Sequence, residues 1–385
     1  MDMRFRAIGV ALAATALVAQ PALAADPKLS ETMAWSAYDV GSGGYNQAVA
    51  IGSALKNKYG INLRVIPGKN DVSRLLPLKT GRLDFVANGA GSYMAQEGVY
   101  EFGAKTWGPL PLRVLLTNIG NQAAAMIIAG DAGIKTPADL KGKRVSWVVG
   151  GPALNQNVTA VLAFANLTWD DVEKVEFGGY AASLDAIVNN QSDAGFSVSV
   201  AGKAYALEKS PRGLTYLHMP ASDTEGWKRV QAIAPFMIPV TATDGAGLSK
   251  EKPAETTSYP YPILHTMADR KAEDVYAMMR AMDEAYPQYK DNAPGNYGWA
   301  LDRQNLEWVI PYHEGAIKYF KDKGVWKDAH QKHNDALVKR QQVLADAWKA
   351  VLAQNLDDDA HMKAWQKARA TALRDAGMDA VLEAW

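Results

Sequence analysis

The sequence predicts an α/β protein made of two doubly wound lobes that are joined by a hinge. Three observations point to this fold class. Short apolar runs alternate with helical patterns, the alternation occurs in two successive halves, and glycine-rich loops stand where strands pass into helices. A strand followed by a helix and a second strand gives a parallel sheet with right-handed crossovers. Two such series therefore predict two sheets, each covered by helices.

The first series begins near residue 32. Apolar runs predict strands at 32–38, 63–66 and 84–88, and helical patterns lie between them at 45–58 and 72–80. The second series begins near residue 122. It predicts strands at 123–129, 144–149, 175–177 and 193–197, and helices at 155–166 and 182–190. Each half therefore has the strand and helix alternation of one lobe.

The rest of the chain, from residue 220 onward, is less regular. Prolines interrupt the stretch after residue 220, where 233–239 and 261–267 read as strands that return to the first lobe, and helices are expected at 272–285, 301–309 and 314–323. The last block, 329–385, is almost entirely helix-forming, with apolar residues at helical spacing. Because this apolar stripe covers fewer than three heptads, it favours two helices packed on a lobe over a coiled-coil dimer arm.

The N-terminus has the pattern of a secretory signal peptide over residues 1–24. Arg4 and Arg6 precede an apolar run at 7–18, and Ala22 and Ala24 form a small-residue cleavage site. The alternative, a retained anchor or a buried first helix, leaves the cleavage site without a role. We therefore expect a mature chain that works in the periplasm.

The composition excludes several classes of protein. The chain has 41 basic and 41 acidic residues, which argues against a nucleic-acid partner, and it contains no cysteine for a lipid anchor or a disulfide. No stretch after the signal reaches the ~20 apolar residues of a membrane span. We therefore expect no direct membrane insertion.

The first glycine-rich loop is the strongest candidate for ligand contact. Ser42, Gly43, Gly44 and Tyr45 stand where a strand passes into a helix, so that free backbone N–H groups and the positive end of the helix dipole are available. This arrangement suits a carboxylate. The loop lacks both the dinucleotide and the P-loop glycine spacing. The alternative is a tight turn without a ligand.

A counterpart in the second half completes a predicted cleft. Two glycines at 150 and 151 precede a helix whose start carries Asn155 and Gln156. Ligands bind at the carboxyl ends of the strands in open α/β sheets, so two such loops define a cleft between the lobes. The amides offer hydrogen-bond donors and acceptors, although Asn155 fits the role of a helix cap equally well.

Further candidates follow other strands: Lys69, Arg74, Asn88, Tyr180, Ser183 and Ser197. Lys69 or Arg74 can neutralise an acidic group, and Arg can do so with two parallel hydrogen bonds. The alternative for either residue is a solvated surface charge.

Catalytic chemistry has little support. There is no cysteine and no Gly-x-Ser-x-Gly elbow, and His330 and His333 form a close pair without a third metal ligand. The sequence therefore predicts no enzyme activity, no metal site and no cofactor.

Four stretches together resemble one family, the TAXI solute receptors of tripartite ATP-independent periplasmic (TRAP) transporters. They are the loop at 41–45, the segments 75–85 and 137–145, and the segment 311–321. The phrase at 137–145 is similar to many periplasmic binding proteins, whereas Gly315 to Tyr319 is similar to TAXI members alone. The resemblance runs from about residue 33 to residue 326.

The resemblance implies a type II periplasmic-binding-protein fold, with lobe I at 25–120 and 232–328, lobe II at 121–231, and an additional helical extension at 329–385. It also implies a receptor that closes on a small organic anion, such as glutamate or a 2-oxo acid, and docks to a TRAP permease. Relatives often carry hydroxyl residues where this chain has Pro152 to Asn155, which puts an amino-acid ligand in doubt. The alternatives are a receptor that presents its ligand to a sensor and a periplasmic enzyme on the same scaffold.

Overall fold

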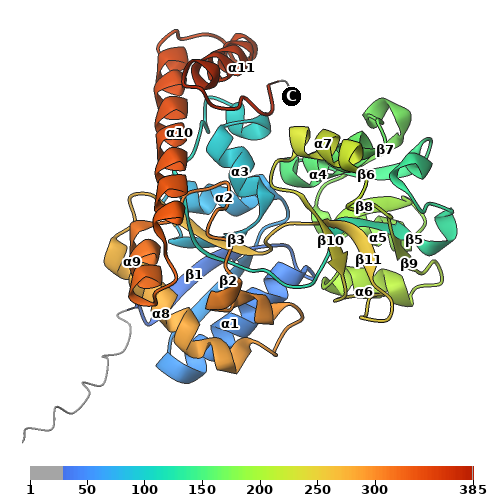
Figure 1. Ribbon diagram of the computed structural model, residues 1–385, viewed down its shortest axis with the longest axis horizontal. Coiled ribbons are helices and arrows are strands. Elements are labelled where there is room, and N and C mark those ends of the chain that lie inside the picture. Colours follow the sequence, from blue (N-terminus) through green and yellow to red (C-terminus); the bar gives the residue numbers. More distant parts are fainter. Residues whose placement is uncertain (1–28, 384) are drawn as a thin grey trace, which may run out of the picture.

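A computed structural model describes residues 29–383 and 385, and two five-stranded sheets form its framework (Figure 1). The signal-peptide prediction lies outside the described residues. The first sheet has the strand order β2-β1-β3-β12-β4. Its strands are β1 (Thr32–Ala37), β2 (Asn62–Pro67), β3 (Phe85–Asn88), β4 (Leu112–Thr117) and β12 (Ile263–Met267). β1 pairs in parallel with β2 and β3, whereas β12 runs antiparallel to β3 and β4.

The second sheet repeats this plan, with the order β7-β6-β8-β5-β9. Its strands are β5 (Ala124–Ala129), β6 (Arg144–Val148), β7 (Glu173–Phe177), β8 (Ala194–Val198) and β9 (Leu214–Tyr216). β6 is parallel to β7 and β8, and β5 is antiparallel to β8. In both sheets, the fourth strand in the order, β12 in the first and β5 in the second, runs antiparallel to both of its neighbours. The chain therefore has the two-lobed, type II periplasmic-binding-protein fold.

Helices cover both faces of each sheet (Figure 1). Around the first sheet, α1 (Gly43–Tyr59), α8 (Ala272–Tyr289) and α9 (Glu314–Asp322) pack together, and α2 (Asp71–Lys79) packs with α3 (Ala90–Glu97). Around the second sheet, α4 (Pro152–Phe164) packs with α7 (Thr224–Ile233), and α5 (Tyr180–Val188) packs with α6 (Gly202–Lys209). This is the doubly wound arrangement that the sequence predicts.

Two short segments connect the sheets and are hydrogen-bonded to each other. They are residues 118–123, between β4 and β5, and residues 259–262, which lead into β12. Asn118 and Tyr261 join the two segments through the Tyr261 N–H and the Asn118 carbonyl, 2.8 Å apart. The Gln122 side chain donates to the Tyr261 carbonyl at 2.7 Å, and the Ser258 hydroxyl donates to the Gln122 carbonyl at 3.0 Å. A ribbon of β10 (Ile238–Ala242) and β11 (Ala254–Ser258) precedes the second segment. These paired segments are the hinge of the fold.

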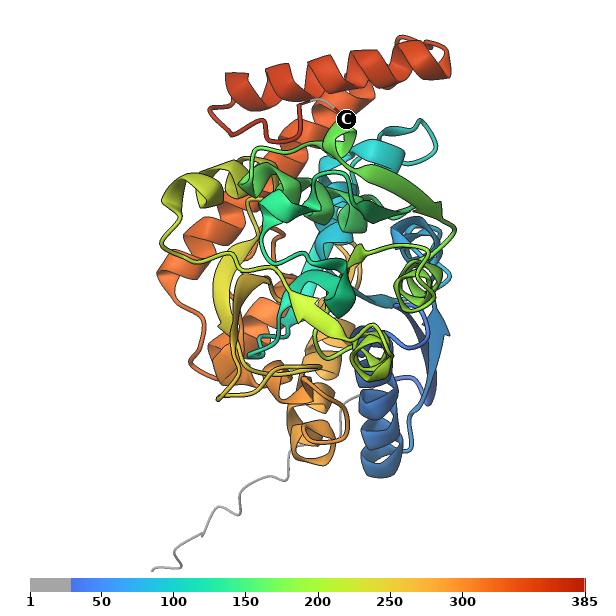
Figure 2. The ribbon, with the colours of Figure 1, turned by 90° about the vertical axis from the view of Figure 1, so that its right-hand side faces the viewer.

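The C-terminal block forms two long helices that stand on the first lobe (Figures 1 and 2). They are α10 (Asp328–Leu352) and α11 (Asp358–Asp375), and they enclose a small core of their own from Leu344, Val351, Trp365 and Leu373. The prediction of two helices packed on a lobe is therefore confirmed.

A buried carboxylate fastens this extension to α3. Glu97, at the last turn of α3, is fully buried and pairs with Arg340 of α10 at 2.7 Å and with the fully buried Arg369 of α11. Burial alone raises the pKa of the Glu97 carboxyl, but its hydrogen bonds to Arg340 and the two arginine charges hold the pKa below its ordinary value. The extension is therefore anchored through an ionised carboxylate.

Two predicted elements were wrong. The segment 301–309 is not a helix, because it forms only the short 3-10 turn Leu301–Arg303 and then irregular chain whose Leu306 and Trp308 are buried. The segment 233–239 is not one strand, because Ile233 ends α7 and β10 begins at Ile238. In both segments most of the apolar residues are there because they pack into the core of the folded protein, and they do not mark one face of a helix or strand. Among the described residues, no helix has the length and apolar character needed to cross a bilayer.

Replacement of Glu97 by Gln tests the anchor. The substitution leaves the fully buried Arg369 guanidinium and the partly buried Arg340 guanidinium without a counter-charge, so we expect the free energy of unfolding to fall by about 3–5 kcal/mol. Denaturant unfolding measures this loss. The matched control is Glu383→Gln, which removes an exposed pair with Arg374 in the same extension and should cost under about 1 kcal/mol. Equal losses for the two variants would contradict the role of Glu97.

Candidate ligand-binding site

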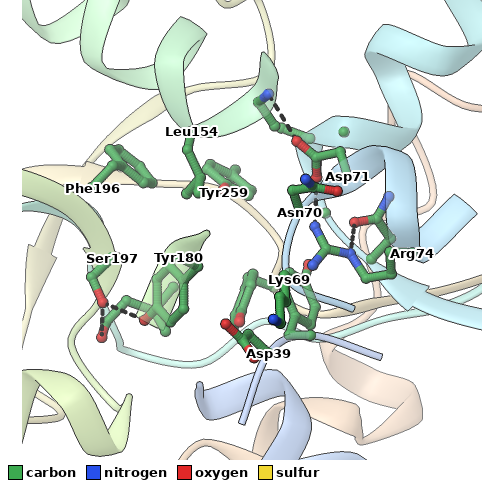
Figure 3. Close-up of a pocket in the computed structure, with 18 residues that line it drawn as sticks. Asp39, Lys69, Asn70, Asp71, Arg74, Leu154, Tyr180, Phe196, Ser197 and Tyr259 are labelled. Carbon is green, nitrogen blue, oxygen red and sulfur yellow. Dashed lines mark hydrogen bonds and ion pairs between the residues drawn. The ribbon is translucent and has the colours of Figure 1, made fainter. Parts of the chain in front are cut away.

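A small cavity lies between the lobes, where the carboxyl ends of strands from both sheets meet (Figure 3). It has a volume of about 40 Å³, which is room for about three water molecules. Its wall combines four charged side chains, several aromatic rings and the starts of four helices, α2, α3, α4 and α5. The lining residues are Tyr38, Asp39, Lys69, Asn70, Asp71, Arg74, Asn88, Gly89, Ala90, Gly91, Ala153, Leu154, Tyr180, Phe196, Ser197, Val198, Tyr259 and Tyr261.

Arg74 is the fixed positive charge of the cavity. It projects from α2, is only 5% exposed, and lies over the Tyr38 ring with 4.2 Å between its guanidinium carbon and the ring centre. Its Nε donates to Asn88 Oδ1 at 2.8 Å, and a terminal nitrogen donates to the Gly68 carbonyl at 3.2 Å. These contacts hold the guanidinium plane in one orientation.

Asp71 joins Arg74 to the opposite lobe. One carboxylate oxygen accepts from Arg74 at 2.5 Å, and the other accepts from the Ala153 backbone N–H at 3.0 Å (Figure 3). Ala153 lies in the first turn of α4, in the second lobe. Gly91 leaves room for this carboxylate, because a Cβ atom there would lie 2.4 Å from Asp71 Oδ1. The pair is therefore built into the interface between the lobes.

Asp39 makes a second contact of this kind. Its carboxylate, in the loop after β1, accepts from the Ala181 backbone N–H in the first turn of α5 at 3.2 Å. The Tyr180 N–H of the same turn donates to the Lys69 carbonyl at 3.2 Å, and Asn70 donates to the Val149 carbonyl across the cleft at 3.2 Å. The lobes are therefore closed on one another by polar contacts.

Aromatic side chains form the rest of the wall. Phe196 and Tyr259 are stacked at 6.3 Å between ring centres, and the Tyr180 and Ser197 hydroxyl oxygens are 2.8 Å apart. Tyr261 accepts from the Gly44 N–H at 3.2 Å, and burial raises its pKa to about 12. The phenols are therefore neutral at pH 7 and offer flat surfaces with a hydrogen-bonding edge.

A buried polar chain supports Arg74 from behind. Asn88, which accepts from Arg74, donates to the Ser92 hydroxyl at 3.0 Å, and Ser92 lies 3.4 Å from His265 Nδ1. Burial lowers the pKa of His265 to about 3, so this imidazole is neutral at pH 7. The chain continues the polar contacts of the cavity into the first lobe.

The structure brings five of the sequence-predicted site residues together at the cavity. Arg74, Asn88, Tyr180 and Ser197 form part of its wall, and Lys69 lies exposed at its rim. The solvated-surface alternative therefore fits Lys69 and does not fit Arg74, which is buried.

The other predicted residues lie outside the lining, for different local reasons. In the first loop, Ser42 caps α1 by accepting from the Tyr45 N–H at 3.2 Å, and Gly43 lies so close to Val198 and Val200 that a Cβ there would be 3.3 Å from Val200. The second-lobe valines and the Tyr261 hydroxyl, which accepts from Gly44, fill the space in front of this loop.

In the second lobe, three predicted side chains point away from the cavity. Asn155 bonds both backbone groups of Val148, at 2.8 and 2.9 Å, so its role is local. Gln156 reaches the Tyr100 hydroxyl and the Ile233 carbonyl, and Ser183 donates to the Tyr180 carbonyl at 2.8 Å. Two residues before Asn155, the Ala153 backbone N–H is the group that faces the cleft.

The acidic residues of the cavity, and its aromatic residues other than Tyr180, were missed from the sequence. Asp71 stands three residues before Arg74, a helical spacing that signals an ion pair. Tyr259 and Tyr261 alternate with prolines in the stretch that forms the hinge, and this pattern gave no signal for a binding site. The described residues hold no group of three His, Cys, Asp or Glu side chains placed for a metal ion.

Comparison with known proteins decides the family. A sequence profile of the NMT1-like family matches residues 40–324, which is most of the chain. The chain belongs to the NMT1-like family. This match includes most of both lobes and all but two of the residues that line the cavity, since β1, Tyr38 and Asp39 precede it, and it ends before the C-terminal helices. No curated protein matches the sequence.

Several solved structures are similar to this member of the NMT1-like family at low identity. A Bordetella bronchiseptica RB50 protein is 16% identical, with a TM-score of 0.45, and 80% of this chain and 98% of that chain are covered. The alkanesulfonate-binding protein SsuA from Xanthomonas axonopodis pv. citri, bound to MOPS, is 16% identical with a TM-score of 0.40, covering 85% of this chain and 94% of that chain. An ABC transporter periplasmic binding protein from Brucella ovis, with glutathione bound, is 11% identical with a TM-score of 0.42, covering 92% and 82%.

Gly91→Ala tests the packing of the Asp71 carboxylate. The added methyl group would lie 2.4 Å from Asp71 Oδ1, so the carboxylate must move and its pair with Arg74 must loosen. We expect a loss of about 1–3 kcal/mol in the free energy of unfolding. In Gly178→Ala, the new methyl group meets no atom within 4 Å, so this control should change stability by about 0.5 kcal/mol or less. A neutral effect of Gly91→Ala would show that the carboxylate is not tightly packed.

The buried imidazole gives a pH prediction. The pKa of His265 in the folded protein is about 3, below its value of about 6.5 in the unfolded chain. The stabilisation from keeping His265 neutral is complete above pH 6.5 and is lost as the pH falls toward 3. Between pH 7 and pH 5, the wild type should lose about 2 kcal/mol more unfolding free energy than His265→Gln.

Proposed function

We propose that this protein is a periplasmic solute receptor that closes around a small organic carboxylate and delivers it, unchanged, to a TRAP-type membrane permease. One observation carries the ligand class. Arg74 and the first free N–H of α4 converge from opposite lobes on one point of the cavity, and that point holds a carboxylate, the side chain of Asp71. A guanidinium group and a helix start both favour an anion there.

The walls support a ligand with a flat or apolar body. Leu154, Tyr180, Phe196 and Tyr259 line the cavity on the side away from Arg74 (Figure 3). Apolar and aromatic surface favours burial of hydrocarbon, and the Tyr180 and Ser197 hydroxyls offer hydrogen bonds to a polar group. We therefore favour a monocarboxylate with an aromatic or aliphatic body over a compact dicarboxylate.

Receptor action requires the lobes to separate. The closed cavity of about 40 Å³ is too small for such a molecule, and four backbone and side-chain contacts close it from the two sides. In our proposal, residues 25–120 and 232–328 move as one lobe against 121–231, about the hinge segments near Asn118 and Tyr261. Glu97 keeps the extension at 329–385 attached to the first lobe. Ligand binding would then favour the closed form.

The delivery step is supported by the sequence rather than by the cavity. The segments at 41–45 and 311–321 resemble TAXI receptors of TRAP transporters, and the signal-peptide pattern at 1–24 supports a periplasmic location. A permease that takes the ligand from the closed receptor is the partner that this resemblance implies.

Calorimetry against organic acids tests the ligand class. We expect monocarboxylates to bind the wild type and to be recovered chemically unchanged after long incubation. Arg74→Gln should weaken this binding about 10- to 100-fold, because a charge-assisted hydrogen bond contributes about 1.5–3 kcal/mol. The matched control is Arg82→Gln, at an exposed arginine outside the cavity, which should leave the affinity unchanged. Binding of uncharged compounds alone would refute the carboxylate, and turnover would refute the receptor.

A further inference from the structure

We infer that the Asp71 carboxylate occupies the place of the ligand's carboxylate when the site is empty, so that a ligand enters by displacing it. This inference rests on the proposed carboxylate function and adds a specificity-determining residue to it. If Asp71 holds this place, the lobes can close without a ligand, and the Asp71 side chain competes with the ligand's carboxylate for the anion site.

The contacts of Asp71 are those expected of a bound ligand. Its two oxygens bridge the lobes, one to Arg74 in the first and one to the Ala153 N–H in the second, at 2.5 and 3.0 Å. A group that stabilises the closed form must interact with both lobes at once. The Asp71 side chain is almost fully buried at this position, with 3% of its surface exposed.

The helix that receives this carboxylate cannot cap itself. The N-cap of α4 is Gly151, which has no side chain, and the next residue is Pro152, which has no N–H. The Ala153 N–H is therefore the first backbone donor of the helix, and Asp71 is its partner. When the lobes part, this N–H loses Asp71 and faces the open cleft, where a ligand carboxylate can accept its hydrogen bond.

Arg74 is held more firmly than Asp71. Besides Asp71, the guanidinium contacts Asn88, Gly68 and the Tyr38 ring, all within the first lobe, so these contacts persist when the lobes separate. Asp71 has no other hydrogen-bonding partner among the described residues than Arg74 and Ala153. Displacing Asp71 therefore breaks two side-chain contacts, and a ligand carboxylate restores both.

This exchange has a consequence for selectivity. Because one carboxylate replaces another, the anionic group of the ligand adds little net affinity, and the body of the ligand against Tyr180, Phe196 and Tyr259 must supply most of it. A small anion such as acetate has no such body. The wild type should therefore discriminate strongly against simple anions, even though its site carries a buried arginine.

Asp71→Ala, combined with chemical rescue, tests the inference. Without ligand, we expect this variant to have a larger radius of gyration in solution scattering than the wild type, because one contact between the lobes is lost. Acetate should reduce the radius toward the wild-type value and raise the melting temperature, while equal concentrations of acetamide should do neither. Acetate should bind the variant at least tenfold more tightly than the wild type.

Controls separate this effect from general loss of stability. Asp131→Ala removes an aspartate that pairs with Arg212 on the second lobe, and neither residue lines the cavity, so this variant should show neither opening nor rescue. An unchanged radius in Asp71→Ala, or equal effects of acetate and acetamide, would overturn the inference. The rescue uses acetate alone, so it can succeed even if every acid in the calorimetric panel fails to bind the wild type. Conversely, the panel can identify a ligand while the rescue fails.

Discussion

The closed arrangement of this protein depends on one constraint, the unsatisfied N–H groups at the starts of the second-lobe helices. α4 and α5 both begin after a glycine and have no side-chain cap of their own. Asp71 and Asp39, from the first lobe, accept hydrogen bonds from their first turns. Because a buried helix start needs a hydrogen-bond partner, the loops after β1 and β2 must lie where they do whenever the cleft is closed. Opening transfers these donors to water or to a ligand.

α3 connects the cavity with the C-terminal extension. Its first residues, Ala90 and Gly91, line the cavity beside Asp71, and its last turn carries Glu97. Every residue of this helix is buried, and the two arginines from α10 and α11 fix its far end. The extension therefore helps to hold the wall against which the Asp71 carboxylate is packed, although it lies outside the part of the chain that the family profile matches.

The sequence was sufficient for the architecture and for part of the site. Alternation of strands and helices places the loops after parallel strands at one edge, so Arg74, Asn88 and Tyr180 could be assigned to a cleft without knowing its shape. The residues that were misplaced depend on smaller differences. Ala153 and Asn155 are two positions apart on one helix, yet the first faces the cleft and the second bonds back to Val148. The composition of the loop does not show which residues of the helix start face the cleft and which face the strand.

The contacts between lobes could not be predicted for a different reason. The partner of Asp71 lies 82 positions away, in a lobe whose placement depends on the hinge. No local pattern joins the two residues. The irregular segment after Leu301 also could not be predicted from local sequence. Its Leu306 and Trp308 are buried in the core, but the segment forms neither a helix nor a strand. Local signals describe each lobe, whereas the site belongs to both.

The paired hinge segments also determine how faithfully the cleft can re-form. Two segments of the chain cross between the lobes side by side. Hydrogen bonds of Asn118 and Gln122 to Tyr261 join them. A double connection of this kind allows one lobe to rotate toward the other about a single axis. It resists twisting or sliding of one lobe relative to the other. In the receptor action that we propose, each closing motion would therefore return Ala153 to the same point beside the Asp71 and Arg74 pair. The geometry of recognition is set as much by these few backbone hydrogen bonds as by the side chains that touch the ligand.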